Sequence, residues 1–279
     1  YFDHWKSIEH IKFEYLEKFP SFCLIHSKEI NHPIGSALHA RMSKAFKKTK
    51  FIIANSKYTK DLAIRMNIED KKIHIINPGT NYPIEIGKEQ KKRAKEIFGD
   101  SFPKIITVAR LDKRKSHQNV LMTIKNLIPS YPDIKYVCIG SGDEKKNLEN
   151  LKKQLGLEKQ VVFLERTEEK LKAALLNESD LFLMPSVVYK KSVEGFGISF
   201  IEAASYGKAS IGGVAGGEAD AIEDGRTGHL CDGNDLNSIY TTVLNIFQNN
   251  KYKILGLHAK DFSRKFKWKN ITKIYLSLI

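Results

Sequence analysis

From residue 104 onward, short apolar runs alternate with longer segments in which apolar and polar positions repeat with helical spacing. Buried parallel strands are apolar throughout, and surface helices carry one apolar face, so the runs predict strands and the longer segments predict helices. This pattern predicts a doubly wound α/β domain built on a parallel sheet. The expected strands cover 104–109, 135–139, 161–164, 181–184, 209–212 and 229–231, and the expected helices lie near 116–128, 144–155, 168–177, 198–206 and 235–248.

The first 80 residues repeat the same plan in shorter form. Strands are expected at 22–25, 51–54 and 72–76, and helices near 4–18, 35–48 and 57–66. Three strands rarely suffice for a doubly wound unit, so this unit is expected either to be incomplete or to be completed by other parts of the chain. The expected domains are therefore a partial N-terminal domain (1–90), a polar, lysine-rich linker (91–103) and a C-terminal domain (104–260).

The length and the charge narrow the classes of partner. A chain of 279 residues exceeds the usual size of one compact core, which favours two domains. The 46 basic and 32 acidic residues give a net charge of +14, which favours anionic partners such as nucleotides, phospholipid surfaces or nucleic acids. Most of the excess is dispersed lysine, which fits an ordinary solvated surface equally well. Nucleic acid is not favoured, because no zinc finger or RNA-binding aromatic motif is present.

The expected location is the cytoplasm. The three cysteines are far apart and odd in number, so they suggest neither a disulfide framework nor a zinc ribbon. No apolar run is long enough to cross a bilayer. The segment 35–51 is expected to form a helix that carries Arg41, Lys44, Lys47 and Lys48. It is a candidate for peripheral contact with an anionic membrane on its inner face, against the alternative of a plain solvated helix.

Candidate chemistry lies after the strands, because open α/β sheets bind ligands beyond the carboxyl ends of their strands. Arg110 and Lys115 follow the first strand of the second domain, where a guanidinium and an ammonium would suit a diphosphate. The alternative is that they are two surface cations among many. Gly140 and Gly142 follow the next strand but lack the full dinucleotide spacing, so a nicotinamide cofactor is not supported.

The stretch "EGFGISFIEAASYGK" (194–208) places two glutamates eight positions apart around a glycine-rich turn and an apolar helix. Glycines beside helix N-terminal amides make an anion site. Glu202 is costly among apolar neighbours unless it meets donors, and sugar or ribose hydroxyls would serve. The two carboxylates are thus expected to grip the two ends of a sugar nucleotide. The open alternative is a buried Glu202 satisfied by arginine or backbone, with Glu194 on the surface.

These motifs together resemble a known family. "VARLDKRKS", "IGSGD" and "MPS…EGFGISFIEAASYGKASIGG…AGGEADAIEDGRTGHL" resemble, over roughly 104–250, the C-terminal domain of the retaining family 4 glycosyltransferases, which have the GT-B fold of two Rossmann-like domains. "FCLIHS" and "FIIANSKYTKDLA" resemble N-terminal elements of that family more loosely. The tail, "FKWKNITKIYLSLI" in 261–279, is similar to its last helix, which crosses back onto the N-terminal domain.

The resemblance implies a transferase that moves a sugar, hexose-like, from a UDP-, GDP- or ADP-sugar to a glycan or lipid-linked acceptor in cell-envelope polysaccharide synthesis. It implies no cofactor and no metal, because cations and a helix terminus neutralise the leaving group. The implied roles are donor-diphosphate binding by Arg110, Lys115 and the segment Gly195, Phe196, Gly197 and Ile198, ribose binding by Glu202, and catalytic positions near the donor sugar for Glu194 and, across the cleft, His26.

The sequence departs from the family at three points. Ser116 stands where a glycine is usual, and Asp220 stands near where a glutamate is usual. The family's first strand and glycine-rich loop are not found, so this chain is expected to bind nucleotide but to transfer sugar poorly, with a longer form restoring turnover. Two alternatives stay open: a GT-B sugar-nucleotide epimerase, and a non-catalytic sugar-nucleotide-binding or assembly partner.

Overall fold

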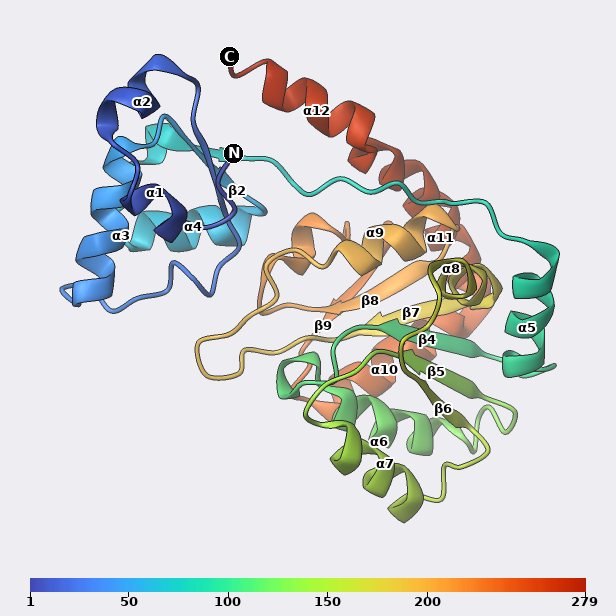
Figure 1. The fold of residues 1–279 in the computed structure, drawn as a ribbon. Helices are drawn as coiled ribbons and strands as arrows, with labels where there is room; N and C mark the ends of the chain where they lie inside the picture. The colour runs from blue at the N-terminus through green and yellow to red at the C-terminus, as the bar shows by residue number, and fades with distance from the viewer.

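The computed structural model describes residues 1–279 as two α/β units, one small and one large (Figure 1). The N-terminal unit contains a three-stranded parallel sheet in the order β1-β2-β3. The short apolar runs form these strands at or near the expected positions, and most side chains of the first two strands are buried. Its elements are α1 (Lys6–Glu9), α2 (Phe13–Lys18), β1 (Phe22–Ile25), α3 (Ala37–Lys48), β2 (Phe51–Ala54), α4 (Lys57–Arg65), η1 (Asp70–Lys72) and β3 (Ile73–Ile75).

The larger unit contains a six-stranded, fully parallel sheet in the order β6-β5-β4-β7-β8-β9. The strand order reverses beside β4, which creates the crevice where such sheets bind ligands. The strands are β4 (Lys104–Val108), β5 (Lys135–Ile139), β6 (Val161–Leu164), β7 (Leu181–Met184), β8 (Ala209–Gly213) and β9 (Gly228–Cys231).

Helices cover both faces of the large sheet (Figure 1). One face packs against α6 (His117–Leu127), α7 (Lys145–Gln154) and α10 (Leu236–Phe247), and the other against α5 (Lys88–Phe98), α8 (Glu169–Glu178) and α9 (Ile198–Ser205). Two buried clusters, one on each face, form the core of this unit. Short 3-10 turns complete it at η2 (Lys113–Lys115), η3 (Gly217–Asp220), η4 (Gln248–Asn250) and η5 (Arg264–Phe266).

The expected linker at 91–103 is wrong. Residues Lys88–Phe98 form the helix α5, and its buried residues Ala94 and Phe98 join the core of the large unit together with Tyr82. The segment reads as polar because five of its eleven residues are lysine or arginine, yet the buried Ala94 and Phe98 lie on one helical face, four positions apart. The large unit therefore begins well before residue 104.

The expected crossing helix is present, with a later start. Residues up to Ser263 belong to α11 (Lys251–Ser263), which packs on the large unit, and only α12 (Trp268–Leu276) reaches the small one. There Ile271 packs with Phe22 and Ile53 of the small sheet. No helix in the structure is both long enough and apolar enough to cross a membrane.

Two segments connect the units and run beside each other (Figure 1). The first leads from β3 to α5, and the second leads from α11 to α12. The Thr80 N–H of the first segment donates to the Phe266 carbonyl of the second, at 2.7 Å. Gly79 lies directly against the indole of Trp268, where a larger residue would clash. The two connections are thus fastened to each other.

Candidate functional site

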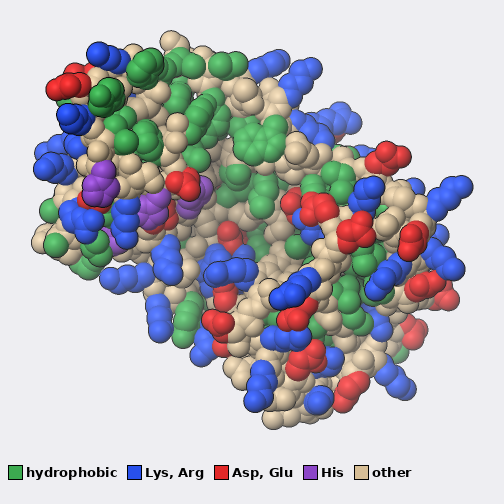
Figure 2. Space-filling view, viewed as in Figure 1, with side chains coloured by type: hydrophobic (Ala, Val, Ile, Leu, Met, Phe, Trp, Pro, Cys, Tyr) green, Lys and Arg blue, Asp and Glu red, His purple; other side chains and the backbone are tan.

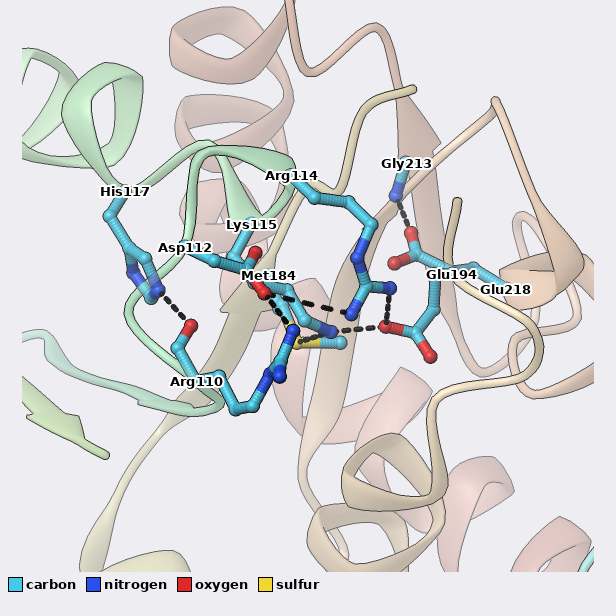
Figure 3. A network of polar contacts seen from close by, with 9 residues as sticks. All are labelled: Arg110, Asp112, Arg114, Lys115, His117, Met184, Glu194, Gly213 and Glu218. Carbon is cyan, nitrogen blue, oxygen red and sulfur yellow. Dashed lines mark hydrogen bonds and ion pairs between the residues drawn. The ribbon is translucent and has the colours of Figure 1, made fainter. Parts of the chain in front are cut away.

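The loops that follow β4 and β7 meet at the carboxyl edge of the large sheet and form one chain of alternating charges (Figure 3). Parallel strands bring the residues after their carboxyl ends to the same edge, which explains why segments 80 residues apart in the sequence meet here. The charges run Arg110, Asp112, Arg114, Glu194 and Lys115.

Glu194 is the centre of this network. Its carboxylate forms an ion pair with the ammonium of Lys115 and accepts a 2.7 Å hydrogen bond from Nη1 of Arg114. The three side chains are only 7–15% exposed. Burial alone would raise the pKa of Glu194, but Lys115 and Arg114 outweigh it and hold the pKa below its ordinary value. The three groups carry a net charge of +1, which leaves the cluster attractive to an anion.

The structure places Arg110 and Lys115 at opposite ends of this network rather than against each other. Arg110 is 76% exposed and pairs with Asp112 at 2.7 Å, whereas Lys115 is buried, with its Nζ 3.2 Å from Sδ of Met184. The backbone of Arg110 is fixed, because the buried His117 ring donates to its carbonyl at 3.0 Å. A diphosphate held by both cations would therefore require the exposed Arg110 side chain to swing toward it.

The glycine turn at 195–197 lies against the small unit. A side chain at Gly195 would collide with the His26 carbonyl oxygen and the Asn55 amide. Gly197 caps α9 with a φ of +88°, a conformation that favours glycine, while Phe196 is buried and Ile198 begins the helix. The His26 backbone thus lies directly against the turn, and its expected place near a donor sugar stays a prediction. Its side chain lines a small neighbouring cavity of about 70 Å³.

Glu202 has a partner from the protein itself. Its carboxylate lies 3.1 Å from Nζ of Lys172 on α8, and this ammonium also lies 4.8 Å from the ring centre of Tyr82. Burial raises the pKa of Glu202, and Lys172 offsets that effect only in part. The structure therefore satisfies Glu202 with a lysine, whereas the sequence suggested arginine or backbone as the alternative to a ribose.

Sequence reasoning missed Glu218, which is 1% exposed at the start of η3. One carboxylate oxygen accepts from the Gly213 N–H, while the other, Oε1, has no hydrogen-bond partner (Figure 3). Burial raises the pKa of Glu218 to about 8, and the Ser186 hydroxyl, Lys115 and the Gly213 N–H lower it only in part. An acid inside a glycine-rich loop was the available signal, but a single glutamate in "GGEAD" gives no indication of its burial.

Arg114 was also missed, because the run "KRK" offers three adjacent cations and no rule selects the middle one. The two departures from the family pattern find local explanations. Ser116 has a φ of +54°, where glycine is easiest, and its hydroxyl donates to the Gly233 carbonyl at 2.7 Å. Asp220 joins the two units, because its carboxylate accepts from the Lys57 N–H at 2.9 Å and from the Asn77 amide at 3.2 Å.

With this geometry in place, comparison with known proteins identifies the family. The model of the glycosyl transferases group 1 family matches residues 88–262, and the chain belongs to that family. The matched region begins with α5, in agreement with the place of that helix in the large unit.

Two curated relatives illustrate the similarity. An uncharacterised glycosyltransferase of Methanocaldococcus jannaschii is 29% identical over 235 residues, which cover 82% of this chain and 58% of that protein. A GDP-mannose-dependent α-(1-6)-phosphatidylinositol monomannoside mannosyltransferase of Mycolicibacterium smegmatis is 28% identical over 158 residues, 56% of this chain and 41% of that protein. The chain thus spans about half the length of the curated relatives it matches.

Solved structures confirm the fold. HepE of Anabaena, crystallised in complex with UDP, superposes with a TM-score of 0.80 at 18% identity and covers 95% of this chain and 73% of its own. Sucrose-phosphate synthase of Thermosynechococcus elongatus gives a TM-score of 0.79 at 18% identity, over 99% of this chain and 72% of its own. The predicted GT-B arrangement of two Rossmann-like units is confirmed.

Proposed function

We propose that this chain is the donor-binding part, with a portion of the acceptor side, of a retaining hexosyltransferase that uses a nucleotide-sugar and needs no metal ion. The observation that carries the proposal is the buried Arg114–Glu194–Lys115 cluster at the carboxyl edge of the parallel sheet. Family membership and the sugar nucleotides named for its relatives support it.

The proposed chemistry follows from the charges. When the bond between the anomeric carbon and the diphosphate oxygen breaks, its electron pair stays on the diphosphate. Lys115, Arg114 and the N-terminal amides of α9 would stabilise that charge. Arg110 would close over the diphosphate from its exposed position. Together they would supply the positive charge that a divalent cation would otherwise provide.

Glu194 would accept hydrogen bonds from the donor-sugar hydroxyls once the ligand displaces one of its cations. His26 would border the sugar from the small unit, across from Gly195. Glu202 would exchange its contact with Lys172 for ribose hydroxyls, or share the lysine with them. The acceptor would be a glycan or a lipid-linked glycan reached from a cytoplasmic or membrane-peripheral position.

A thermal-shift panel of UDP, GDP, ADP, UDP-glucose and GDP-mannose, followed by an assay for release of nucleoside diphosphate, tests this proposal. A ligand that binds the native state raises the melting temperature by mass action. We expect one nucleotide series to stabilise the chain, and Lys115→Ala to abolish most of the shift, while Lys125→Ala on the exposed side of α6 retains it. No stabilisation by any nucleotide would overturn the proposal.

The same experiment separates the rival functions. Binding without sugar transfer or donor hydrolysis would favour a non-catalytic sugar-nucleotide-binding partner. Conversion of the donor into an epimeric sugar nucleotide would favour an isomerase. A requirement for added divalent cation, lost with a chelator, would contradict metal independence.

A further inference from the structure

A cavity of about 690 Å³ adjoins the charged network, and its walls carry many more cations than anions. Its lysines and arginines are Lys28, Arg110, Lys113, Arg114, Lys190 and Lys191. Only three carboxylates share the walls, those of Asp112, Asp143 and Glu144. In the space-filling view, Lys and Arg side chains border the hollow between the two units (Figure 2).

Four of the six cations have no anionic partner. The two arginines pair with Asp112 and Glu194, but no ion pair or side-chain hydrogen bond involves Lys28, Lys113, Lys190 or Lys191. Lys113 and Lys190 instead both lie 5.6 Å from the ring centre of Tyr189, on which an ammonium is attracted to the aromatic face. A concave wall with an excess of positive charge concentrates anionic ligands.

A tight turn presents two of these lysines. The backbones of Tyr189 and Ser192 pair with each other through hydrogen bonds of 3.0 and 2.9 Å, so Lys190 and Lys191 form the tip between them. Lys190 has a φ of +55°, which is uncommon for a residue with a side chain. Such strain persists where the surrounding structure holds it, and it often marks a site that contacts a ligand.

The cavity adjoins the cluster proposed to hold the donor and shares two arginines with it. Lys115 and Glu194 do not line the cavity, whereas Arg110 and Arg114 belong to both regions. Lys28 comes from the small unit, two residues after His26. A ligand in the cavity would therefore lie between the two units and next to the proposed donor-sugar position.

We propose that this cavity binds the acceptor substrate through a phosphoryl group. This inference rests on the proposed transferase function. A phosphomonoester carries a charge of about −1.5 to −2 at neutral pH and three acceptor oxygens, so one group can engage several ammonium donors at once. A single carboxylate would leave most of the excess positive charge uncompensated. The phosphoryl group can belong to a free sugar or polyol phosphate or to a lipid headgroup.

Glycerol 3-phosphate, titrated calorimetrically into protein saturated with the nucleotide that stabilises it, tests the proposal. Saturation blocks the donor site, so further binding reports on a second site. We expect glycerol 3-phosphate to bind and glycerol not to bind. The double variant Lys190→Ala/Lys191→Ala should weaken glycerol 3-phosphate at least tenfold and change nucleotide affinity less than twofold. Lys28→Ala should weaken it as well, because the small unit contributes to the cavity.

The matched control is Lys91→Ala/Lys92→Ala, which removes two lysines from α5 outside the cavity and should leave both affinities unchanged. A sedimentation arm with phosphatidylcholine vesicles, with and without phosphatidic acid, distinguishes a lipid source of the same phosphomonoester. Binding only to phosphatidic acid vesicles, lost in Lys190→Ala/Lys191→Ala, would support the proposal and identify the source as lipid.

Three results would overturn the inference. Equal binding of glycerol and glycerol 3-phosphate would remove the phosphoryl requirement. Equal glycerol 3-phosphate affinity in wild type and in Lys190→Ala/Lys191→Ala would show that the turn does not contribute to binding of the phosphoryl group. If Lys190→Ala/Lys191→Ala weakened nucleotide binding as much as glycerol 3-phosphate binding, these lysines would belong to the donor site. Failure of all nucleotides to bind would contradict the proposed function instead, and the titration on unloaded protein would still test the cavity.

Discussion

Two charged regions meet between the units, and they use their charges in opposite ways. Around Glu194 the cations are buried, paired and fixed by short contacts. In the neighbouring cavity the lysines are exposed and unpaired. Buried pairs are held in one geometry but are costly to disrupt, whereas exposed charges attract ligands and contribute little to stability. The comparison suggests that the first region positions a ligand and the second recruits one.

The largest expected effect comes from breaking the buried pair on one side. Lys115→Met removes one of the two cations that hold the buried Glu194 carboxylate, and breaking a buried ion pair from one side costs about 3–5 kcal/mol. We expect chemical denaturation to show a loss of this order. Lys115→Met/Glu194→Gln should recover none of it, because the second substitution leaves the Arg114 guanidinium, which is only 14% exposed, without its Glu194 partner. Full stability of Lys115→Met would show that the region is not a tightly paired cluster.

Glu218 provides a test that depends on pH. Its pKa is about 8 in the folded protein, against an ordinary value of 4.5. As pH rises from 4.5 to 8, the unfolded chain releases a proton that the folded chain retains, so the free energy of unfolding falls. Glu218→Gln cannot ionise and lacks this loss. Its stability relative to wild type should rise across that window, by about 1.4 kcal/mol for each pH unit between the unfolded and folded pKa values.

Denaturation of both proteins at pH 5 and pH 8 measures this difference, with the exposed Glu158→Gln as control. The stability gap between Glu218→Gln and wild type should be small at pH 5 and larger at pH 8. A gap that is equal at the two pH values would mean that Glu218 is ionised in the folded protein and finds partners for its charge.

Substitutions of Glu194 and Glu202 should have different effects on ligand binding. Glu202→Gln removes a charged acceptor for ribose, so UDP or GDP and the matching sugar nucleotide should weaken alike, by about tenfold for one charge-assisted hydrogen bond. Glu194→Gln frees Lys115 and Arg114 from their carboxylate, so free nucleotide should bind at least as well as before, while sugar transfer falls. Calorimetry and turnover measure the split, and equal losses of both ligands in both variants would contradict it.

The smallest effect is expected on α3. Of its four candidate membrane-facing cations, Arg41 pairs with Glu9 at 2.8 Å, and Lys48 donates to the backbone carbonyls of Glu9 and Ile11. Lys44 and Lys47 have no such ion pair. Lys44→Ala/Lys47→Ala should therefore reduce sedimentation with acidic vesicles only modestly, by about 1 kcal/mol per lysine at most, and only at low salt. Equal recovery of the protein with neutral and acidic vesicles would contradict the hypothesis that this helix contacts an anionic membrane.

Much of the fold was predictable because the strands are continuous apolar runs. All six strands of the large sheet match their expected bounds or differ from them by one residue, for example Lys135–Ile139 and Leu181–Met184. The helix α5 was missed because its apolar face consists of only three side chains, Ala94, Ile97 and Phe98, in a segment rich in lysine. The helix α11 was missed because apolar residues such as Leu257 also lie on its exposed side, which obscures the helical period.

The candidate site was predictable only as a set of positions. Spacing after the strands pointed to Lys115 and Glu194, and the structure brings them into contact. It did not show that Arg110 faces solvent, or that Glu202 meets Lys172 from a helix 30 residues earlier. Such pairings depend on how helices pack over the sheet, and no local pattern records that. The roles of these residues toward a donor stay predictions.

The fastened connections between the units have a mechanical consequence. Two free tethers would allow the units to separate, slide and twist, but the bond from Thr80 to the Phe266 carbonyl joins the two strands of chain into one narrow hinge. Rotation of one unit relative to the other about that line is then expected to be their easiest relative motion. The carboxylate of Asp220 forms a further connection between the units, because it accepts from the Lys57 N–H and from the Asn77 amide. Opening of the units for substrates to enter and leave would break the contacts of Asp220, while the bond between Thr80 and Phe266 stays intact.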